Sequence, residues 1–243
     1  MSERVWALHR ATNYLGGSAA PAASASEAEQ ERIGLPIRQS LRCELEAAFA
    51  QRVSCRRFSG AAISLDTLAT LLDAAYGCGP EVVFEGARWP ARPVPSAGAR
   101  YPLELNILAR AVDGLAPGSY RFIAEEHALV RSGADVSFDA LADIFLKQPY
   151  LKPAAAVVVV AGDFELTTAR YGDRGYRYVL FEAGHVAQNL TLAATALEMG
   201  SLSLGGFVDD TLAEVLRLRS VVAPLYGVAI GPPADHADLR QLG

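Results

Sequence analysis

The fold is decided by Ala154-Ala-Ala-Val-Val-Val-Val-Ala161, a run of eight small and β-branched residues. Such a run is typical of a central strand that is buried on both faces. The stretch Val179–Met199 is apolar almost all round and contains closely spaced alanines, which predicts a long helix inside a core or a subunit interface. A strand and a helix of this kind need a large hydrophobic core around them.

Further elements are expected on both sides of this pair. A short helix over 5–15 is followed by Gly16–Ser26, whose composition is typical of a flexible linker. Ser40 and Ser64 are predicted to cap helices that begin directly after them. The expected helices are 41–52, 65–76, 141–146 and one from Asp209 or Asp210 to Arg219, and the expected strands are 103–109, 119–123, 127–131 and 225–230. Because strands and helices are interleaved without regular βαβ winding, we predict an α+β domain over 35–243, preceded by an N-terminal helix and linker over 1–34.

Composition excludes several classes of protein. Of the 243 residues, 51% are hydrophobic, which excludes a wholly disordered or fibrous chain. The net charge of −5 argues against a dedicated nucleic-acid binder. No apolar run is long enough to cross a membrane, and the first residues lack the apolar stretch of a signal peptide, so we expect a cytoplasmic protein without a membrane partner. The cysteines and histidines lack metal-binding spacings, so we expect no metal.

Two short stretches suit an anionic or flat ligand. Arg52-Val-Ser-Cys-Arg56 places two guanidiniums around a hydroxyl, a set that binds phosphate or polarises ring carbonyl oxygens. The alternative is a solvated basic helix end. In Pro95-Ser-Ala-Gly98, small residues allow close backbone approach and proline stiffens the loop, although an ordinary turn has the same pattern. The glycine signatures of Rossmann and P-loop nucleotide sites are absent from the sequence.

Two further stretches lie around the long helix. Tyr171–Asn189 brings aromatic rings, arginines and amides to the helix start. The alternative there is a satisfied core network of the polar residues His185, Gln188 and Asn189. Ser203–Phe207 predicts a tight turn whose backbone amides could face an anion or a ring edge.

Together these four stretches resemble the nitroreductase superfamily of FMN-binding proteins. Within it they resemble the thiazole- and oxazole-forming azoline dehydrogenases of peptide natural-product pathways. The resemblance runs from about Trp6 to Pro232, and its most specific parts are Pro95–Glu104 and Gly175–Asn189. It implies a central, mainly antiparallel sheet wrapped by helices, in an intertwined homodimer with two FMN sites at the interface.

The resemblance also implies which residues contact FMN. The ribityl phosphate and the N1/O2 side of the ring are held by the residues that match Arg52, Ser54 and Arg56. A loop from the partner subunit, which matches Pro95, Ser96, Ala97 and Gly98, lies against the isoalloxazine. The turn near N5 matches Leu204, Gly205 and Gly206, and a basic residue near the C-terminus that adds a phosphate ligand matches Arg240.

The implied activity is FMN-dependent oxidation of a thiazoline or oxazoline to a thiazole or oxazole. The substrate would be a peptide or a carrier-bound intermediate, and a cyclodehydratase or peptide synthetase is a possible partner. Two alternatives stay open. One is an NAD(P)H-dependent nitro- or quinone reductase of the same fold, and the other is a flavin-free structural subunit of a biosynthetic complex.

One dipeptide departs from the family pattern. Azoline dehydrogenases typically carry Lys-Tyr before the arginine-rich stretch, and this chain carries Arg170-Tyr171. An arginine cannot be deprotonated in a protein, so Arg170 cannot be a base, although it could orient substrate or favour the phenolate of Tyr171. Tyr171 is therefore the candidate for proton abstraction, with Asp173 next. The alternative is that Tyr171 only packs on the flavin ring.

Overall fold

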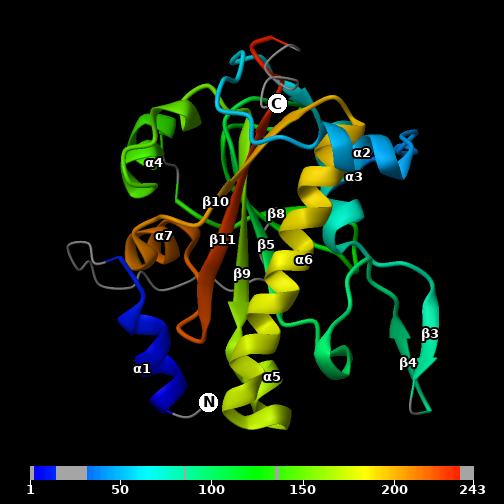
Figure 1. The fold of residues 1–243 in the computed structure, drawn as a ribbon, viewed down its shortest axis with the longest axis vertical. Coiled ribbons are helices and arrows are strands. Elements are labelled where there is room, and N and C mark those ends of the chain that lie inside the picture. The colour runs from blue at the N-terminus through cyan, green and yellow to red at the C-terminus, as the bar shows by residue number, and fades with distance from the viewer. Residues whose placement is uncertain (1–2, 15–31, 85, 135–136, 236–243) are drawn as a thin grey trace.

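A seven-stranded sheet forms the centre of the molecule (Figure 1). The computed structural model describes residues 3–14, 32–84, 86–134 and 137–235. The strand order is β1-β8-β7-β5-β9-β11-β10, and all neighbours in this sheet are antiparallel. The strands are β1 (Arg32–Gly34), β5 (Leu103–Ala109), β7 (Gly118–Ile123), β8 (Ala128–Arg131), β9 (Ala156–Asp163), β10 (Gly200–Leu204) and β11 (Val222–Gly231). The expected α+β fold with a mainly antiparallel sheet is confirmed.

Strand β9 lies near the middle of the sheet, between β5 and β11, and all eight of its residues are buried. It begins two residues later than the predicted range and runs two residues further, to Asp163. The valines alternate between the two faces, so Val158 and Val160 join one core cluster while Val157 and Val159 join the other. The apolar run therefore supplies both sides of the molecule, which is why it is continuous and does not alternate.

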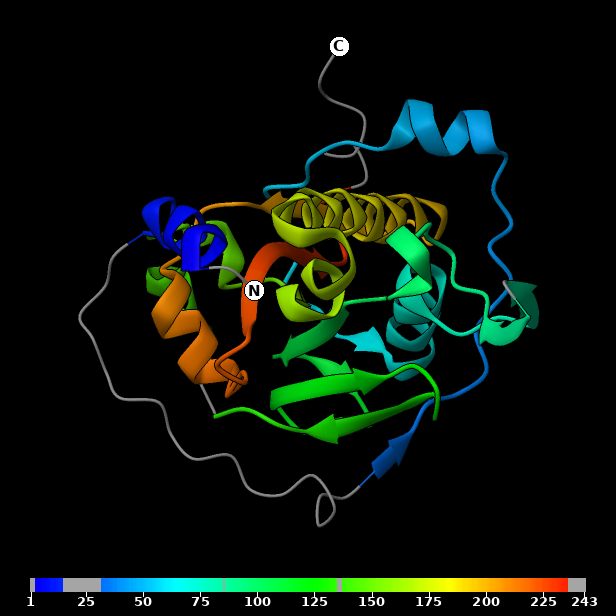
Figure 2. The ribbon, with the colours of Figure 1, turned by 90° about the horizontal axis from the view of Figure 1, so that it is seen from below.

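Helices α3 (Leu65–Tyr76) and α6 (Gly175–Ala196) cover one face of the sheet. The Ser64 hydroxyl caps α3 by accepting a hydrogen bond from Thr67 N at 3.0 Å, as the sequence predicts. Helix α6 begins four residues before its predicted range. Helices α4 (Phe138–Ile144) and α7 (Asp209–Leu216) cover the other face, where a second cluster forms around Phe145 (Figure 2).

Helices α1 (Glu3–Ala11) and α5 (Phe164–Tyr171) meet at the end of the sheet where β9 finishes. The rings of Trp6 and Phe164 make an edge-to-face contact at 5.8 Å. The sequence patterns do not predict α5. It begins directly after β9, where the Asp163 carboxylate accepts a hydrogen bond from Glu165 N at 2.9 Å and caps the helix.

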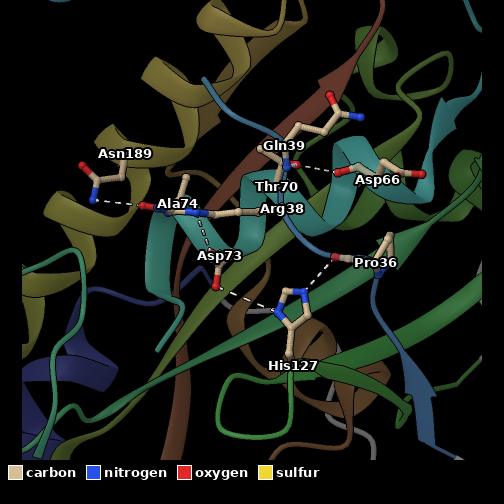
Figure 3. Close-up of polar contacts among 9 residues, drawn as sticks. All are labelled: Pro36, Arg38, Gln39, Asp66, Thr70, Asp73, Ala74, His127 and Asn189. Carbon is tan, nitrogen blue, oxygen red and sulfur yellow. Dashed lines mark hydrogen bonds and ion pairs between the residues drawn. The ribbon is translucent and has the colours of Figure 1, made fainter. Parts of the chain in front are cut away.

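Helix α2 (Leu45–Gln51) begins four residues later than predicted, and Ser40 does not cap it. Figure 3 shows why: the segment before it lies extended across α3. Gln39 N donates to Thr70 Oγ1 at 2.8 Å, and the His127 ring donates to the Pro36 carbonyl at 2.8 Å. Arg38 pairs with Asp73 at 3.4 Å. These tertiary contacts hold 36–39 out of a helical conformation.

The remaining elements are short. They are a parallel pair, β2 (Ile63–Ser64) with β6 (Val112–Asp113), a hairpin of β3 (Glu81–Phe84) and β4 (Ala87–Pro90), and 3₁₀ turns at Ala97–Ala99, Pro149–Leu151 and Gly172–Arg174. Within the described part of the chain, no helix has the length and apolar character needed to span a bilayer.

Candidate functional site

The loop before β5 meets the end of α5 at Gly98. This residue has φ +61°, and a Cβ placed on it would lie 2.7 Å from the Tyr171 hydroxyl oxygen and 3.4 Å from Arg170 Nη1. Both the left-handed backbone and the close approach require a glycine here. The structure thus brings the loop Pro95–Gly98 together with the Arg170-Tyr171 pair, in one chain.

Neighbouring side chains orient the Tyr171 ring. It packs edge-to-face on the Tyr178 ring, with centroids 5.2 Å apart. The Arg170 guanidinium carbon lies 5.7 Å from the Tyr171 ring centre. Tyr171 is half-buried and Arg170 is exposed. A phenol can donate or accept a proton, whereas the Arg170 guanidinium can only bind and orient.

Arg52–Arg56 runs extended along the edge of the sheet. Cys55 is buried, and its backbone N–H donates to the Ser201 carbonyl of β10 at 2.8 Å. On either side of this buried residue, Arg52 and Ser54 are half-buried and Arg56 is exposed. Within the residues that the structure describes, neither arginine makes an ion pair. Two such guanidiniums and the nearby Ser54 hydroxyl have the chemistry to bind the phosphate and ring oxygens of FMN.

The two halves of the predicted FMN site lie at opposite ends of the sheet. Next to the arginine segment, Ser201 pairs with Ile230, which pairs with Ala156. Next to the loop, Leu103 pairs with Gly162. The six-residue offset along β9 corresponds to about 20 Å at the usual rise of a strand. Figure 1 shows the same separation, with α2 and the chain that follows it near the top and α5 at the bottom.

The turn after β10 lies between these ends. Leu204 is buried as the last residue of β10, Gly205 is exposed, and Gly206 is half-buried. A Cβ on Gly205 would have no neighbour closer than Tyr226 at 4.0 Å, so this glycine borders open space. The turn begins after Leu204, because Ser203 still pairs with Val228 in the sheet. Arg240 lies outside the described residues.

The polar residues of α6 do not form the core network weighed as an alternative. His185 and Gln188 are exposed, and Asn189 is half-buried, with its amide nitrogen 3.5 Å from the Ala74 carbonyl. The expectation that His185 sits in the core is wrong. His185 and Gln188 lie on the outer stripe of α6, the side with exposed residues, which also carries exposed Phe181.

Sequence reasoning missed a buried acid, Glu182, which is only 3% exposed. The Tyr76 hydroxyl donates to its Oε1 at 3.0 Å, and Ser96 of the loop is a further hydrogen-bond partner. Burial raises the pKa of Glu182 to about 7, and burial together with this carboxyl raises the pKa of Tyr76. The sequence feature that could have revealed this buried acid is its helical spacing, because Glu182 lies among the apolar residues that α6 turns towards the sheet.

The described residues include no group of three or more histidines, cysteines or acids that could hold a metal ion. The chemistry available at these positions is that of guanidiniums, hydroxyls and one buried carboxyl.

Comparison with known proteins shows the family to which the chain belongs. The sequence profile of the nitroreductase family matches residues 49–232, well over half of the chain. The chain belongs to the nitroreductase family. The protein MJ1384 of Methanocaldococcus jannaschii, which carries this family name, is 39% identical over 188 residues, covering 77% of this chain and 90% of that protein.

Other proteins similar to this nitroreductase-family protein are named for roles in trifolitoxin processing and microcin synthesis. The trifolitoxin-processing protein TfxB of Rhizobium leguminosarum bv. trifolii is 30% identical over 64% of this chain and 43% of its own length. Among solved structures, a nitroreductase-named protein of Anabaena variabilis has a TM-score of 0.70 at 28% identity, covering 84% of this chain and 42% of that one. A chain of the Escherichia coli microcin synthetase McbBCD complex, solved with truncated pro-MccB17 bound, shares the fold, with a TM-score of 0.68 at 22% identity over 97% of this chain and 95% of that one.

Proposed function

We propose that this protein is an FMN-dependent dehydrogenase that oxidises a thiazoline or oxazoline to a thiazole or oxazole. The observation that carries the proposal is the contact of Tyr171 and Arg170 with Gly98, because it sets a phenol against the loop that the family resemblance assigns to the flavin ring. Similarity to TfxB supports a peptide substrate, free or carrier-bound. A cyclodehydratase or a peptide synthetase would be the natural partner, since either one supplies the azoline.

Different residues bind the cofactor and transfer the proton. FMN, when bound, supplies the acceptor for the two electrons and the hydrogen that leave the azoline as hydride. Arg52, Ser54 and Arg56 hold its phosphate and ring oxygens through charge-assisted hydrogen bonds. Tyr171, as phenolate, takes the proton from the adjacent ring carbon on its hydroxyl oxygen, and Arg170 stabilises that charge and orients the substrate. Loss of one hydride and one proton leaves the aromatic ring.

A second candidate is an NAD(P)H-dependent nitro- or quinone reductase, favoured by the 39% identity to MJ1384. The two functions need opposite conditions. Azoline oxidation consumes no nicotinamide, whereas the reductase oxidises NAD(P)H whenever a nitro or quinone acceptor is present.

The test is therefore a pair of assays on the purified, FMN-loaded protein. We expect a thiazoline-containing peptide to lose two mass units under air without NAD(P)H, the mass of the proton and hydride. Nicotinamide oxidation in the presence of a quinone should stay near the rate without enzyme. Rapid NAD(P)H oxidation with an unchanged peptide would assign the reductase function instead, and a protein that never takes up flavin would refute both.

We also propose a homodimer in which each FMN site is completed by both protomers. The loop at Gly98 and the arginine segment are too far apart in one chain to contact one isoalloxazine and its phosphate tail in the implied way. Helix α2 and the outer stripe of α6 lie on the same side of the sheet (Figure 2) and expose large apolar side chains. These are Leu45 at 66% exposure and Phe49 at 58% on α2, and Phe181 at 56% on α6.

Charge placed on this surface should dissociate the dimer. An obligate dimer of this kind buries more than about 2,000 Å² in total, and an aspartate in its apolar centre would be buried without a partner. We expect Phe49→Asp to give a monomer with a lower FMN content, measured by light scattering after gel filtration and by flavin absorbance. Leu8→Asp, a matched change at an exposed leucine of α1, should leave the dimer intact. A native monomer that retains FMN would overturn the shared site.

A further inference from the structure

The loop that leads into β5 is held in an uncommon backbone conformation. Gly98, Ala99 and Tyr101 all have positive φ, at +61°, +51° and +46°. For residues with a Cβ this left-handed region is sterically unfavourable, and it persists only where the surroundings impose it. Some part of the protein must therefore hold the two ends of this loop in place.

Two hydroxyl groups hold the ends. At the start of the loop, Ser96 Oγ accepts a hydrogen bond from Tyr101 N at 2.8 Å. At its end, the Tyr76 hydroxyl accepts one from Leu103 N at 3.2 Å. Each hydroxyl accepts a backbone N–H, so its own hydrogen is free to be donated to a third group.

The third group is the same for both hydroxyls. Tyr76 donates to Glu182 Oε1 at 3.0 Å, and Ser96 is the other hydroxyl partner of this carboxyl. Glu182 comes from α6 and Tyr76 from α3, so the carboxyl ties both ends of the loop to the two helices that cover this face of the sheet. A carboxylate has two oxygens that only accept, which suits two donating hydroxyls.

The outer side of the loop is held by Arg92. Its guanidinium carbon lies 4.5 Å from the Tyr76 ring centre and 5.2 Å from the Tyr101 ring centre, and Nη1 donates to the Tyr76 carbonyl at 2.7 Å. It also pairs with Glu125. Arg92 thus contacts both tyrosine rings, which lie edge-to-face at 6.3 Å, and its charge acts on the Glu182 carboxyl.

We propose that Glu182 is the positioning residue of the Ser96–Leu103 loop. Acting through the hydroxyls of Ser96 and Tyr76, it fixes where Gly98 meets Arg170 and Tyr171. It does not touch these reacting groups itself. The relevance of this placement to flavin and substrate rests on the proposed function, whereas the clamp itself is a property of the folded chain.

The effect of pH on Glu182 indicates that folding stability alone does not explain why an acid is buried at this position. The groups that face it are Tyr76 from α3 and Arg92 and Ser96 from the loop region, and burial outweighs their effect, so the pKa is raised to about 7. A carboxyl with a raised pKa contributes stability that is full below its unfolded pKa and is lost as the pH rises through about 7. At higher pH the protein bears the cost of a buried charge, and a glutamine of the same size would avoid it.

The proposal is tested by amide hydrogen exchange on the full chain, which requires no flavin. Glu182→Gln replaces one of the two acceptor oxygens that the hydroxyls share by a donating amide group. Hydrogen exchange at the Tyr101 and Leu103 amides should therefore rise about tenfold, the effect of losing one net hydrogen bond. Amides in the middle of α3 and α6 should be unchanged. Glu104→Gln, which removes a neighbouring carboxylate outside the clamp, should leave both loop amides as they are.

Ser96→Ala provides the second arm, because it removes one link without disturbing the buried helix. It should raise exchange at Tyr101 to a similar extent, and adding Glu182→Gln to it should raise Tyr101 little further. The melting temperature of Glu182→Gln relative to the parent should also increase between about pH 5 and about pH 8, as the parent ionises its buried acid.

Several outcomes would overturn the clamp: unchanged loop amides in Glu182→Gln, faster exchange spread evenly through α3 and α6, or strictly additive effects with Ser96→Ala. Flavin content is measured separately. A loosened loop with unaltered FMN retention and turnover would refute the proposed contact between loop and flavin, and would leave the clamp standing.

Discussion

Loss of both guanidiniums of the Arg52–Arg56 segment should release FMN. Each charge-assisted hydrogen bond to phosphate or a ring oxygen contributes about 1.5–3 kcal/mol, so each alanine should weaken binding about tenfold or more. We expect the double variant Arg52→Ala with Arg56→Ala to lose about 100-fold or more. The dissociation constant is measured by quenching of flavin fluorescence, and retention by absorbance after dialysis.

The chain offers a matched control for this result. Arg57 is exposed and directly follows Arg56, but it is not among the residues that match the FMN-binding element of the family. Arg57→Ala should therefore bind FMN as the parent does. Unchanged flavin occupancy in the double variant would contradict the assignment of this segment to the cofactor. Equal losses of FMN affinity in Arg52→Ala, Arg56→Ala and Arg57→Ala would show that the segment contributes only general positive charge.

Replacement of Tyr171 by phenylalanine should abolish most of the turnover and leave the flavin in place. A general base typically contributes a factor of about 10²–10⁴, and Tyr171→Phe removes only the hydroxyl while it keeps the ring that packs on Tyr178. The measurement is kcat on a thiazoline peptide together with FMN content. We expect a fall of at least about 100-fold in kcat with FMN content unaltered.

Tyr178→Phe is the control, since it removes a hydroxyl from the other ring of the same pair. It should stay within about threefold of the parent. If Tyr171→Phe also stayed within that range, the tyrosine would only pack on the ring, and Asp173 would be the next candidate base. A loss of FMN in Tyr171→Phe would show that the hydroxyl supports cofactor binding, and the fall in kcat would then not be assigned to proton transfer.

Local patterns alone determined the main elements of this protein. The apolar run at 154–161 became β9, the predicted bounds of β5 and α3 match the structure, and Ser64 caps α3 as expected. These features depend on burial and on hydrogen bonds within a few residues, so the amino-acid order is enough to specify them. The family resemblance rests on the same kind of short stretch.

Tertiary contacts decided the features that the patterns missed. Ser40 has the chemistry of a helix cap, yet the segment before it is held extended, because Gln39 N donates to Thr70 and the His127 ring donates to the Pro36 carbonyl, and α2 begins only at Leu45. His185 looks like a core residue in an apolar helix, yet it is exposed, because helix packing turns another side of α6 towards the sheet. In both cases the packing of elements distant in sequence overrides local preference.

The candidate site shows the same division. Its individual residues could be named from the sequence, because arginine, serine, glycine and tyrosine have chemistry that spacing reveals. Only the tertiary structure set Gly98 against Tyr171, carried Arg52 to the other end of the sheet and placed Glu182 beneath the loop. Those relations join residues as far apart in sequence as Cys55 and Ser201, and they follow from strand register and helix packing, which no local pattern encodes.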